Sequence, residues 1–121
     1  MTYSFEMPGD PVPKGRPRIG KGGHAFTPQR TRDAEAAFGW AAKAAALLGP
    51  LAGPLRVEVT FALENRRRVD LDNLAKLALD ALNGLWWADD SQIAELRATK
   101  RVVGKGLGST TVRAETMDPA P

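Results

Sequence analysis

Large apolar side chains occupy every odd position from residue 55 to residue 63, and polar side chains hold positions 56, 58 and 60 between them. A period of two places the apolar residues on one face of an extended chain, so this pattern predicts a half-buried β-strand. A shorter alternation at the N-terminus, with Tyr3, Phe5 and Met7 between polar residues, predicts a second strand of the same kind.

A first helix is expected to begin at Thr27-Pro28, with threonine as the cap and proline at the first helical position. A start at Thr31 is the alternative. Gly49-Pro50 should end this helix. Its apolar stripe is narrow and consists of Phe38, Ala41, Ala45 and Leu48.

A second helix is expected from Asp72, and Asn83-Gly84 should weaken it near its end. The residues predicted on its buried face are Leu74, Leu77, Ala78, Ala81, Leu82 and Leu85. Trp86 and Trp87 follow, and we interpret them as core or subunit-interface residues. Trp40, in the first helix, is interpreted as a core or edge residue and not as a platform for bases.

Residues 8–26 contain four prolines and five glycines, so no regular element is expected there and the segment is interpreted as a long basic binding loop. A less regular alternation from 91 to 103 predicts a strand with Ala94, Leu96, Ala98 and Val102 on one side. A glycine-rich turn at 104–108 leads to a last strand near 109–115. We therefore expect one α+β (mixed α/β) domain over 1–116, with a small mixed sheet of about four strands, two main helices and a flexible tail at 117–121.

The composition is that of an ordinary soluble domain. The chain has 121 residues, of which 43% are hydrophobic and 26% charged, which suits one domain with a buried core. The absence of cysteine excludes disulfides, thiolate metal sites and cysteine nucleophiles. No apolar run reaches the length of a membrane span and no secretory signal is visible, so a cytoplasmic location is expected.

Charge is distributed unevenly along the chain, although the net charge is only +3. Residues 1–32 carry six cations against Glu6 and Asp10, namely Lys14, Arg16, Arg18, Lys21, Arg30 and Arg32. Three more arginines, Arg66, Arg67 and Arg68, precede an acidic stretch in which Lys76 is the one cation between residues 70 and 95. A basic surface around an acidic centre suits a nuclease, and the alternative is a set of solvated surface charges.

The acidic stretch begins with Asp70 and Asp72. Residues two apart lie on the same side of an extended chain but about 200° apart on a helix, so the two could share a metal only if the chain is extended at Asp70. Lys76 and Asp80 follow at steps of four and form a polar ridge with Asp72. Helix capping and an ordinary ion pair between Asp72 and Lys76 are the structural alternatives.

Asp89 and Asp90 open the next predicted strand and could bring further carboxylates to the site, or could form a polar turn. Lys76 could stabilise charge on a scissile phosphate or orient an attacking water, and we favour the electrostatic role because nearby carboxylates keep a lysine protonated. His24 lies in the basic loop without a partner in the sequence and is a candidate phosphate contact only.

Three motifs of this chain resemble the RusA family of Holliday-junction resolvases. They are Arg68-Val69-Asp70-Leu71-Asp72-Asn73-Leu74-Ala75-Lys76, then Asp80-Ala81-Leu82-Asn83-Gly84, then Asp89-Asp90-Ser91-Gln92-Ile93. The opening Pro11-Val12-Pro13-Lys14-Gly15-Arg16-Pro17-Arg18 and Thr27-Pro28 are also similar to this family, although some members have an asparagine-rich loop there. The resemblance extends in order to about Val112.

The resemblance implies a homodimeric, Mg²⁺-dependent endonuclease, with Mn²⁺ as a substitute ion, that cuts four-way DNA junctions by paired nicks in phage or prophage recombination. By motif, the metal ligands are Asp70, Asp72 and Asp90, and the catalytic lysine is Lys76. Two-fold symmetry of a junction matches an isologous dimer with two copies of one site.

Phosphate contacts that position the DNA without reading bases are expected from the basic residues Lys14, Arg16, Arg18, Arg66, Arg67 and Arg68. A DNA-binding module without catalysis, and a less selective nuclease acting on flaps or RNA, are the alternative functions.

Overall fold

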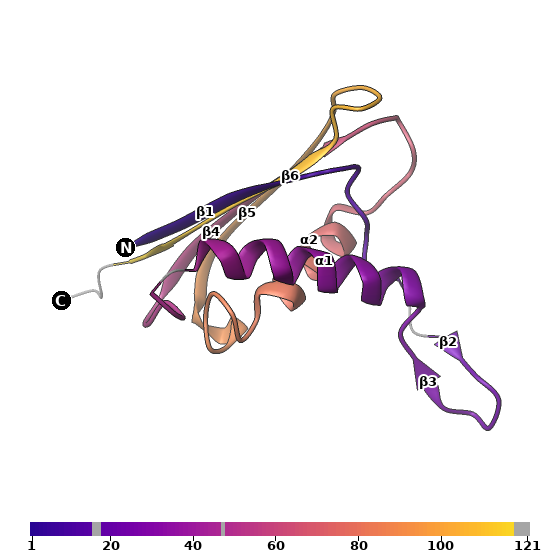
Figure 1. Ribbon diagram of the computed structural model, residues 1–121, viewed down its shortest axis with the longest axis horizontal. Coiled ribbons are helices and arrows are strands. Elements are labelled where there is room, and N and C mark those ends of the chain that lie inside the picture. Colours follow the sequence, from indigo (N-terminus) through magenta and orange to yellow (C-terminus); the bar gives the residue numbers. More distant parts are fainter. Residues whose placement is uncertain (16–17, 47, 118–121) are drawn as a thin grey trace.

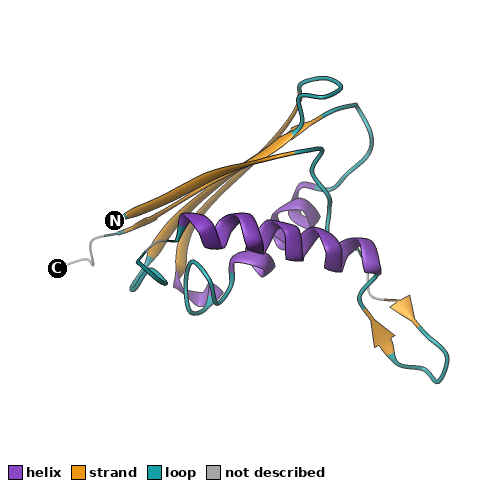
Figure 2. Cartoon of the chain, in the orientation of Figure 1, coloured by secondary structure: helices purple, strands orange, loops and turns teal. Residues whose placement is uncertain are grey.

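The computed structural model describes residues 1–15, 18–46 and 48–117. Four strands form one sheet in the order β1–β6–β4–β5, made of β1 (Thr2–Pro8), β4 (Leu55–Leu63), β5 (Ile93–Val102) and β6 (Ser109–Thr116). β4 pairs with β5 in parallel, and the other two pairings are antiparallel. Two helices, α1 (Gln29–Ala45) and α2 (Leu71–Leu82), cover the same face of the sheet, as Figures 1 and 2 show. The expected α+β class with a four-stranded mixed sheet and two main helices is confirmed.

The core lies between the sheet and the helices. The odd-numbered residues of β4 are all buried there, as the alternation predicted. Trp86 and Trp87 are both fully buried, so their interpretation as core residues is confirmed. Trp86 packs edge-on against Phe5, with ring centroids 5.2 Å apart, and its indole N–H donates to the Ala42 carbonyl at 2.8 Å. The described helices include none that is long and apolar enough to span a bilayer.

The ends of the first helix differ from the prediction. α1 begins at Gln29 with Pro28 at the N-cap position and no side-chain cap, so the capping role expected for Thr27 was wrong. Thr31 is buried inside the helix, where its hydroxyl accepts the Gly15 N–H at 2.9 Å and fastens the preceding loop. The helix ends at Ala45, before Gly49-Pro50.

Two predicted positions of large apolar residues also need correction. Leu48 lies beyond the helix and is 73% exposed, so it does not belong to the buried stripe. Trp40 is 75% exposed and is not a core residue. On α2, Leu74, Leu77, Ala78 and Leu82 are buried as expected, whereas Ala81 is only half-buried. Leu85 lies beyond the end of the helix at Leu82, so its expected place on the buried face of α2 was wrong.

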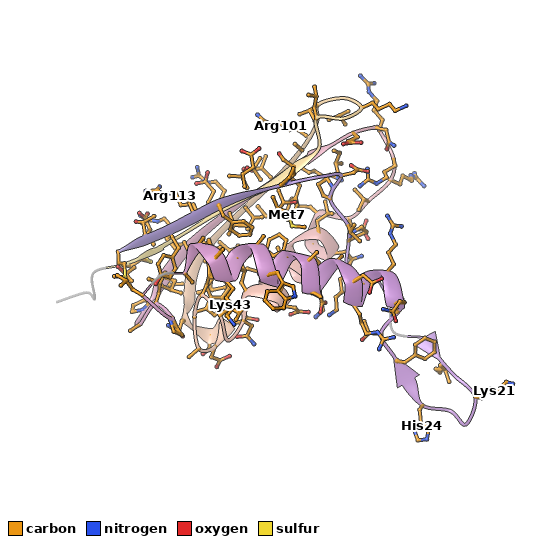
Figure 3. All side chains as sticks on the ribbon, in the orientation of Figure 1. Met7, Lys21, His24, Lys43, Arg101 and Arg113 are labelled. Atoms are coloured by element: carbon orange, nitrogen blue, oxygen red, sulfur yellow. The ribbon has the colours of Figure 1, made fainter. Side chains whose placement is uncertain are left out.

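The glycine-rich segment contains a hairpin that was not expected. β2 (Arg18–Ile19) and β3 (Ala25–Phe26) pair antiparallel, and the turn between them uses positive φ at Gly22 and Gly23, which glycine adopts without steric cost. This hairpin extends away from the body of the molecule, and Figure 3 shows Lys21 and His24 near its far end. We call residues 18–26 the hairpin arm.

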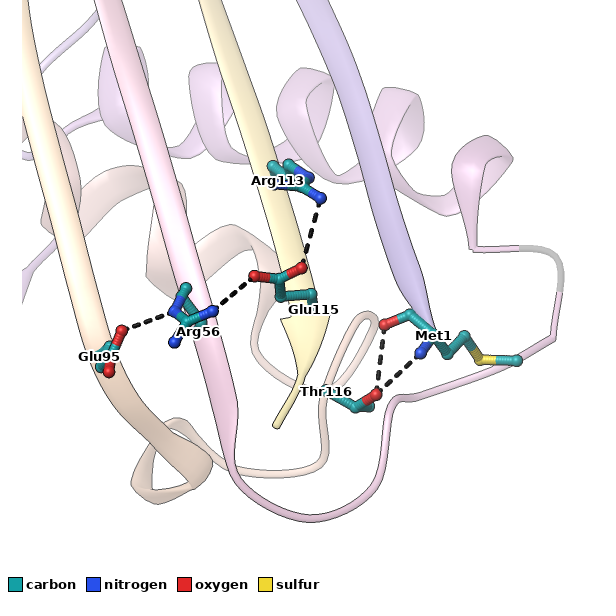
Figure 4. A network of polar contacts seen from close by, with 6 residues as sticks. All are labelled: Met1, Arg56, Glu95, Arg113, Glu115 and Thr116. Carbon is teal, nitrogen blue, oxygen red and sulfur yellow. Dashed lines mark hydrogen bonds and ion pairs between the residues drawn. The ribbon is translucent and has the colours of Figure 1, made fainter. Parts of the chain in front are cut away.

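The face of the sheet opposite the helices is lined by charged side chains. Arg56 of β4 bridges Glu95 of β5, at 2.6 Å, and Glu115 of β6, at 3.0 Å (Figure 4). Hydrogen bonds and charge from Arg56 hold the pKa of the Glu95 carboxyl below its usual value. These pairs link three neighbouring strands across an exposed surface.

Candidate active site

Asp70 is the N-cap residue of α2 and has an extended backbone, with φ −78° and ψ 131°. The condition that the chain be extended at Asp70 is therefore met. Its side chain makes no cap hydrogen bond, and among the described residues it accepts only a long hydrogen bond of 3.4 Å from the Asn73 amide. The carboxylate of Asp70 therefore does not cap the N-terminus of α2.

A pocket of about 600 Å³ lies between α2 and the edge strand β5. Its walls are largely apolar, and the charged residues among them carry the acidic motif. The lining residues are Leu71, Asp72, Ala75, Lys76, Leu79, Asp80, Asp90, Leu96 and Ala98. The pocket thus brings together Asp72, Lys76 and Asp90, three of the four predicted catalytic residues, from α2 and from the segment that precedes β5. Asp70 lies immediately before the first lining residue and is not part of the lining.

Asp90 is held by a neighbour that the sequence did not single out. The buried indole of Trp87 donates its N–H to Asp90 Oδ1 at 2.6 Å, which fixes the carboxylate at the pocket wall. The signal was present in the sequence as a tryptophan three residues before an aspartate, but a buried tryptophan is more often recognised as packing alone.

Asp89 has a different environment from Asp90. It precedes the short 3-10 turn η1 (Asp90–Gln92), its N–H donates to Gln92 Oε1 at 3.1 Å, and Ser91 donates to its carboxylate at 2.8 Å. These contacts are all within the turn, so Asp89 stabilises local structure and does not line the pocket.

The donor set partly fits a hydrated divalent cation. Mg²⁺ is commonly held by one or two carboxylates together with water and phosphate oxygens, and the pocket offers Asp72 and Asp90 for that purpose. Within residues 1–15, 18–46 and 48–117, no three histidine or carboxylate side chains are grouped so that they could hold one ion. The three-carboxylate centre expected from the sequence is therefore not assembled by these residues of a single chain.

Lys76 points from the exposed side of α2 into the pocket region, and among the described residues it has no ion-pair partner. Asp72 lies one turn before it and Asp80 one turn after it on the same helix. The ordinary ion pair between Asp72 and Lys76, one of the structural alternatives, is not formed. An ammonium group without a carboxylate partner at the wall of a pocket can contact an anionic substrate.

Of the basic residues expected to contact DNA, Lys14 and Arg67 are engaged within the protein. Lys14 forms ion pairs with Glu35 and Asp80, and Arg67 pairs with Asp10 at 2.8 Å and donates to the Pro11 carbonyl at 2.6 Å. Burial lowers the pKa of Lys14, but hydrogen bonds and charge from Glu35 and Asp80 outweigh it, so this pKa lies above its usual value.

The structure describes the other basic residues of that set to different extents. Arg66 and Arg68 are exposed and make no ion pair with the described residues. Arg16 lies outside the described residues, and of Arg18 only the backbone, in β2, is described. The hairpin arm also exposes two apolar side chains, Ile19 and Phe26.

Comparison with known proteins identifies the family. The family model for endodeoxyribonuclease RusA matches residues 8–114, which is most of the chain and includes all the motifs above. The chain belongs to the RusA family. Family membership agrees with the resemblance noted in the sequence, and the matched range falls within the expected 1–116 domain. The bounds of that domain and its tail stay a prediction, since residues 118–121 lie outside the described ones.

Individual RusA relatives are similar to between about half and most of this chain. The chain is 35% identical over 113 residues to the crossover junction endodeoxyribonuclease RusA of Escherichia coli (strain K12), an alignment that covers 87% of this chain and 88% of the relative. The protein of that name from Shigella sonnei (strain Ss046) gives the same identity and coverage. The crossover junction endodeoxyribonuclease rusA of Enterobacteria phage 82 is 42% identical over 57 residues, covering 46% of this chain and 48% of the relative.

Proposed function

We propose that this RusA-family chain is a metal-dependent endodeoxyribonuclease that resolves four-way DNA junctions by paired, symmetric nicks. The observation that carries the proposal is the pocket between α2 and β5, where Asp72, Lys76 and Asp90 of the family motifs lie together. The relatives that cover most of this chain are named crossover junction endodeoxyribonucleases, which supports a branched DNA substrate.

Mg²⁺, with Mn²⁺ as a substitute, is the proposed cofactor, and Asp70, Asp72 and Asp90 are its proposed ligands. When bound, such an ion activates a water molecule and stabilises the charge that develops on the phosphate and leaving oxygens. Trp87 would hold Asp90 in place for this role through its 2.6 Å hydrogen bond. Asp70 directly precedes Leu71 of the pocket wall, and its carboxylate makes no cap hydrogen bond.

Lys76 is the proposed electrostatic catalyst. Its ammonium group has no carboxylate partner among the described residues, so it can contact the scissile phosphate and stabilise negative charge in the transition state. The apolar wall made by Leu71, Ala75 and Leu96 would reduce the water around this contact and so strengthen it.

Exposed cations outside the pocket are the proposed phosphate contacts. Arg66 and Arg68 precede the catalytic segment, and the hairpin arm carries Lys21 on a stretch, residues 11–32, that contains no acidic residue. Such contacts position the DNA backbone without reading bases. Steric and charge complementarity therefore favour a polyanion approaching along the arm.

A homodimer is the proposed assembly, and the cytoplasm the proposed location. Two nicks related by two-fold symmetry need two copies of the active site, and one chain of this size holds one pocket of this composition among its described residues. The incomplete carboxylate group of a single chain is also consistent with a second chain closing the site.

A substrate panel tests the proposal. Purified protein is incubated with a synthetic four-way junction, a linear duplex, a flap and a single-stranded RNA, with and without Mg²⁺. We expect paired nicks at symmetric positions in the junction, only when Mg²⁺ is present. Tight junction binding without any cleavage would support a binding module instead, and equal cleavage of flap or RNA would support a less selective nuclease.

A further inference from the structure

We infer that Lys14 is a positioning residue of the active site, which holds Asp80 away from Lys76, and that it is not a phosphate contact. This inference rests on the proposed function, because it concerns how Lys76 stays available to DNA. It also replaces the expectation from the sequence that Lys14 binds DNA directly.

Lys14 is fixed between the two helices by its side chain and its backbone. Its ammonium group lies 3.0 Å from Asp80 Oδ2 and is also bonded to Glu35, while its backbone N–H donates to the Asn73 carbonyl at 2.9 Å. We call the two ion pairs the Lys14 clasp, since they link the loop to both α1 and α2. The next residue, Gly15, is held as well, because its N–H donates to the Thr31 hydroxyl at 2.9 Å. A Cβ at this position would lie 2.6 Å from that oxygen, so the close approach needs glycine.

The charged residues of α2 explain how the Lys14 clasp affects Lys76. Asp80 lies one turn after Lys76, both line the same pocket, and side chains four apart on a helix are close enough to pair. Asp80 nevertheless pairs with Lys14. Lys76 is the one cation in the sequence of α2, so it is the natural partner for Asp80 once Lys14 loses its charge. A Lys76 held by Asp80 could no longer reach a phosphate freely.

Lys14 differs from the surface cations of the same chain. Its side chain is only 20% exposed and lies between two carboxylates, which would repel an approaching phosphate. Arg66 and Arg68 are exposed and free of ion pairs with described residues. The chain therefore offers a matched comparison between an engaged cation and two unengaged ones.

The first experiment measures how junction affinity depends on salt, in buffer with Ca²⁺ in place of Mg²⁺, for the full chain and for Lys14→Gln, Arg66→Gln and Arg68→Gln. Removing one phosphate contact should reduce the slope of log K against log [salt] by about 0.9. We expect this reduction for the two arginine variants and an unchanged slope for Lys14→Gln. A reduction of about 0.9 for Lys14→Gln would overturn the inference.

The second experiment separates binding from catalysis. Under single-turnover conditions we expect Lys14→Gln to lower the junction cleavage rate by about tenfold with junction affinity within about twofold, because only the transition-state contact of Lys76 is weakened. Adding Asp80→Asn should restore the rate to within about twofold of Asp80→Asn alone, since Asp80 then no longer competes for Lys76. A double variant as slow as Lys14→Gln would refute the role of Asp80.

Two further comparisons keep the outcome interpretable. Lys14→Gln leaves the carboxylates of Glu35 and Asp80 without their partner, which could prevent folding. In that case the salt slope of junction affinity and the cleavage rate are compared between Asp80→Asn and the double variant, which differ only at Lys14. If the parent chain cuts no junction, the proposed function fails. The inference is then judged on a double-mutant cycle of urea unfolding for Lys14 and Asp80, in which an absent coupling would refute the Lys14 clasp itself.

Discussion

Asp90 and Asp72 face the same pocket but are held very differently. Asp90 accepts a hydrogen bond from a fully buried indole, whereas Asp72 lies on the exposed side of the first turn of α2. A fixed carboxylate contributes a preset ligand direction, and a free one can adjust to the ion and the DNA. Each residue should therefore respond to substitution in its own way.

Replacing Asp72 by Asn should abolish junction cleavage while binding stays equal or becomes tighter, because the substitution removes both a metal ligand and a negative charge near the DNA. Gel-shift affinity and Mg²⁺-dependent nicking measure the two effects. Asp33→Asn is the matched control. Asp33 lies on the exposed side of α1 outside the pocket, and its substitution by Asn changes the net charge by the same amount. Normal nicking by Asp72→Asn would show that the ligand assignment is wrong.

Replacing Trp87 by Phe should weaken metal affinity more than catalysis. The substitution removes the N–H that holds Asp90 but keeps most of the buried ring, and loss of such an outer hydrogen bond typically costs about 10- to 100-fold in metal affinity. A titration of cleavage rate against Mg²⁺ should shift to higher concentration with a similar plateau. Trp86→Phe, whose N–H bonds Ala42 away from the pocket, should leave that titration in place.

Helix α2 lies between the core and the pocket. One side of the helix packs on the sheet, and the other side carries the acidic motif. Both features were readable from the sequence, since helical spacing predicted the buried residues and the carboxylates lay between them. The helix ends were harder to predict. Thr27 has the right side chain for a cap, but the buried bond from Gly15 to Thr31 sets where the loop meets α1.

The hairpin arm was not predicted, and neither was the exposure of the predicted strand β5, for a different reason. Prolines and glycines argued against regular structure at 8–26, but two glycines with positive φ permit a tight turn in which two short strands pair. In β5, Leu96, Ala98 and Val102 share one face as predicted, but Leu96 and Val102 are about half exposed on this edge strand. Ala94 was placed wrongly, because the register shifts at the start of β5, where Ile93 pairs with Leu55 and packs on the core and Ala94 is exposed. Sequence periodicity indicates which face is apolar and not what covers it.

Truncating Leu82 to Ala should destabilise the fold by about 2–5 kcal/mol, because this fully buried residue of α2 would leave a cavity against the sheet. Urea denaturation measures the change. The same truncation at Leu107, which is 68% exposed in the turn before β6, should change the free energy of unfolding by less than about 0.5 kcal/mol. Equal effects at both sites would contradict the placement of α2 on the core.

The Lys14 clasp should lose its contribution to stability in alkali. The pKa of Lys14 is raised in the folded state, so the contribution is fully present below the unfolded-chain value of 10.5 and is lost as pH rises through the higher folded value. Urea midpoints measured between about pH 9 and about pH 12 should fall more steeply for the parent chain than for the Lys14→Gln, Asp80→Asn double variant. Parallel curves would show that Lys14 is not paired in solution.

At the scale of the whole molecule, acidic and basic functions are separated in space. The acidic pocket lies between α2 and β5, and the hairpin arm projects beyond the N-terminal end of α1 (Figure 1). The net charge of +3 does not indicate this separation. The order of the charged residues along the sequence does.

Junction binding should weaken steeply as salt rises, because phosphate contacts release counterions from DNA. Fluorescence anisotropy over a range of salt concentrations gives the slope, and light scattering at the same protein concentrations gives the mass of the assembly. We expect a steep slope together with the mass of a dimer. A junction affinity that does not change with salt would contradict the proposed phosphate contacts. A monomeric mass at full cleavage activity would contradict the proposed dimer.

The two ends of the described sheet also meet. The Met1 ammonium donates to the Thr116 hydroxyl at 2.9 Å, as Figure 4 shows, and the Thr116 N–H donates to the Met1 carbonyl at the same distance. A short peptide could therefore bridge β6 back to β1, and new ends could be opened in the glycine-rich turn at 104–108. Such a circular permutant would carry its fluorophores or affinity handles at a location chosen by the experimenter, with β1 and β6 joined to each other.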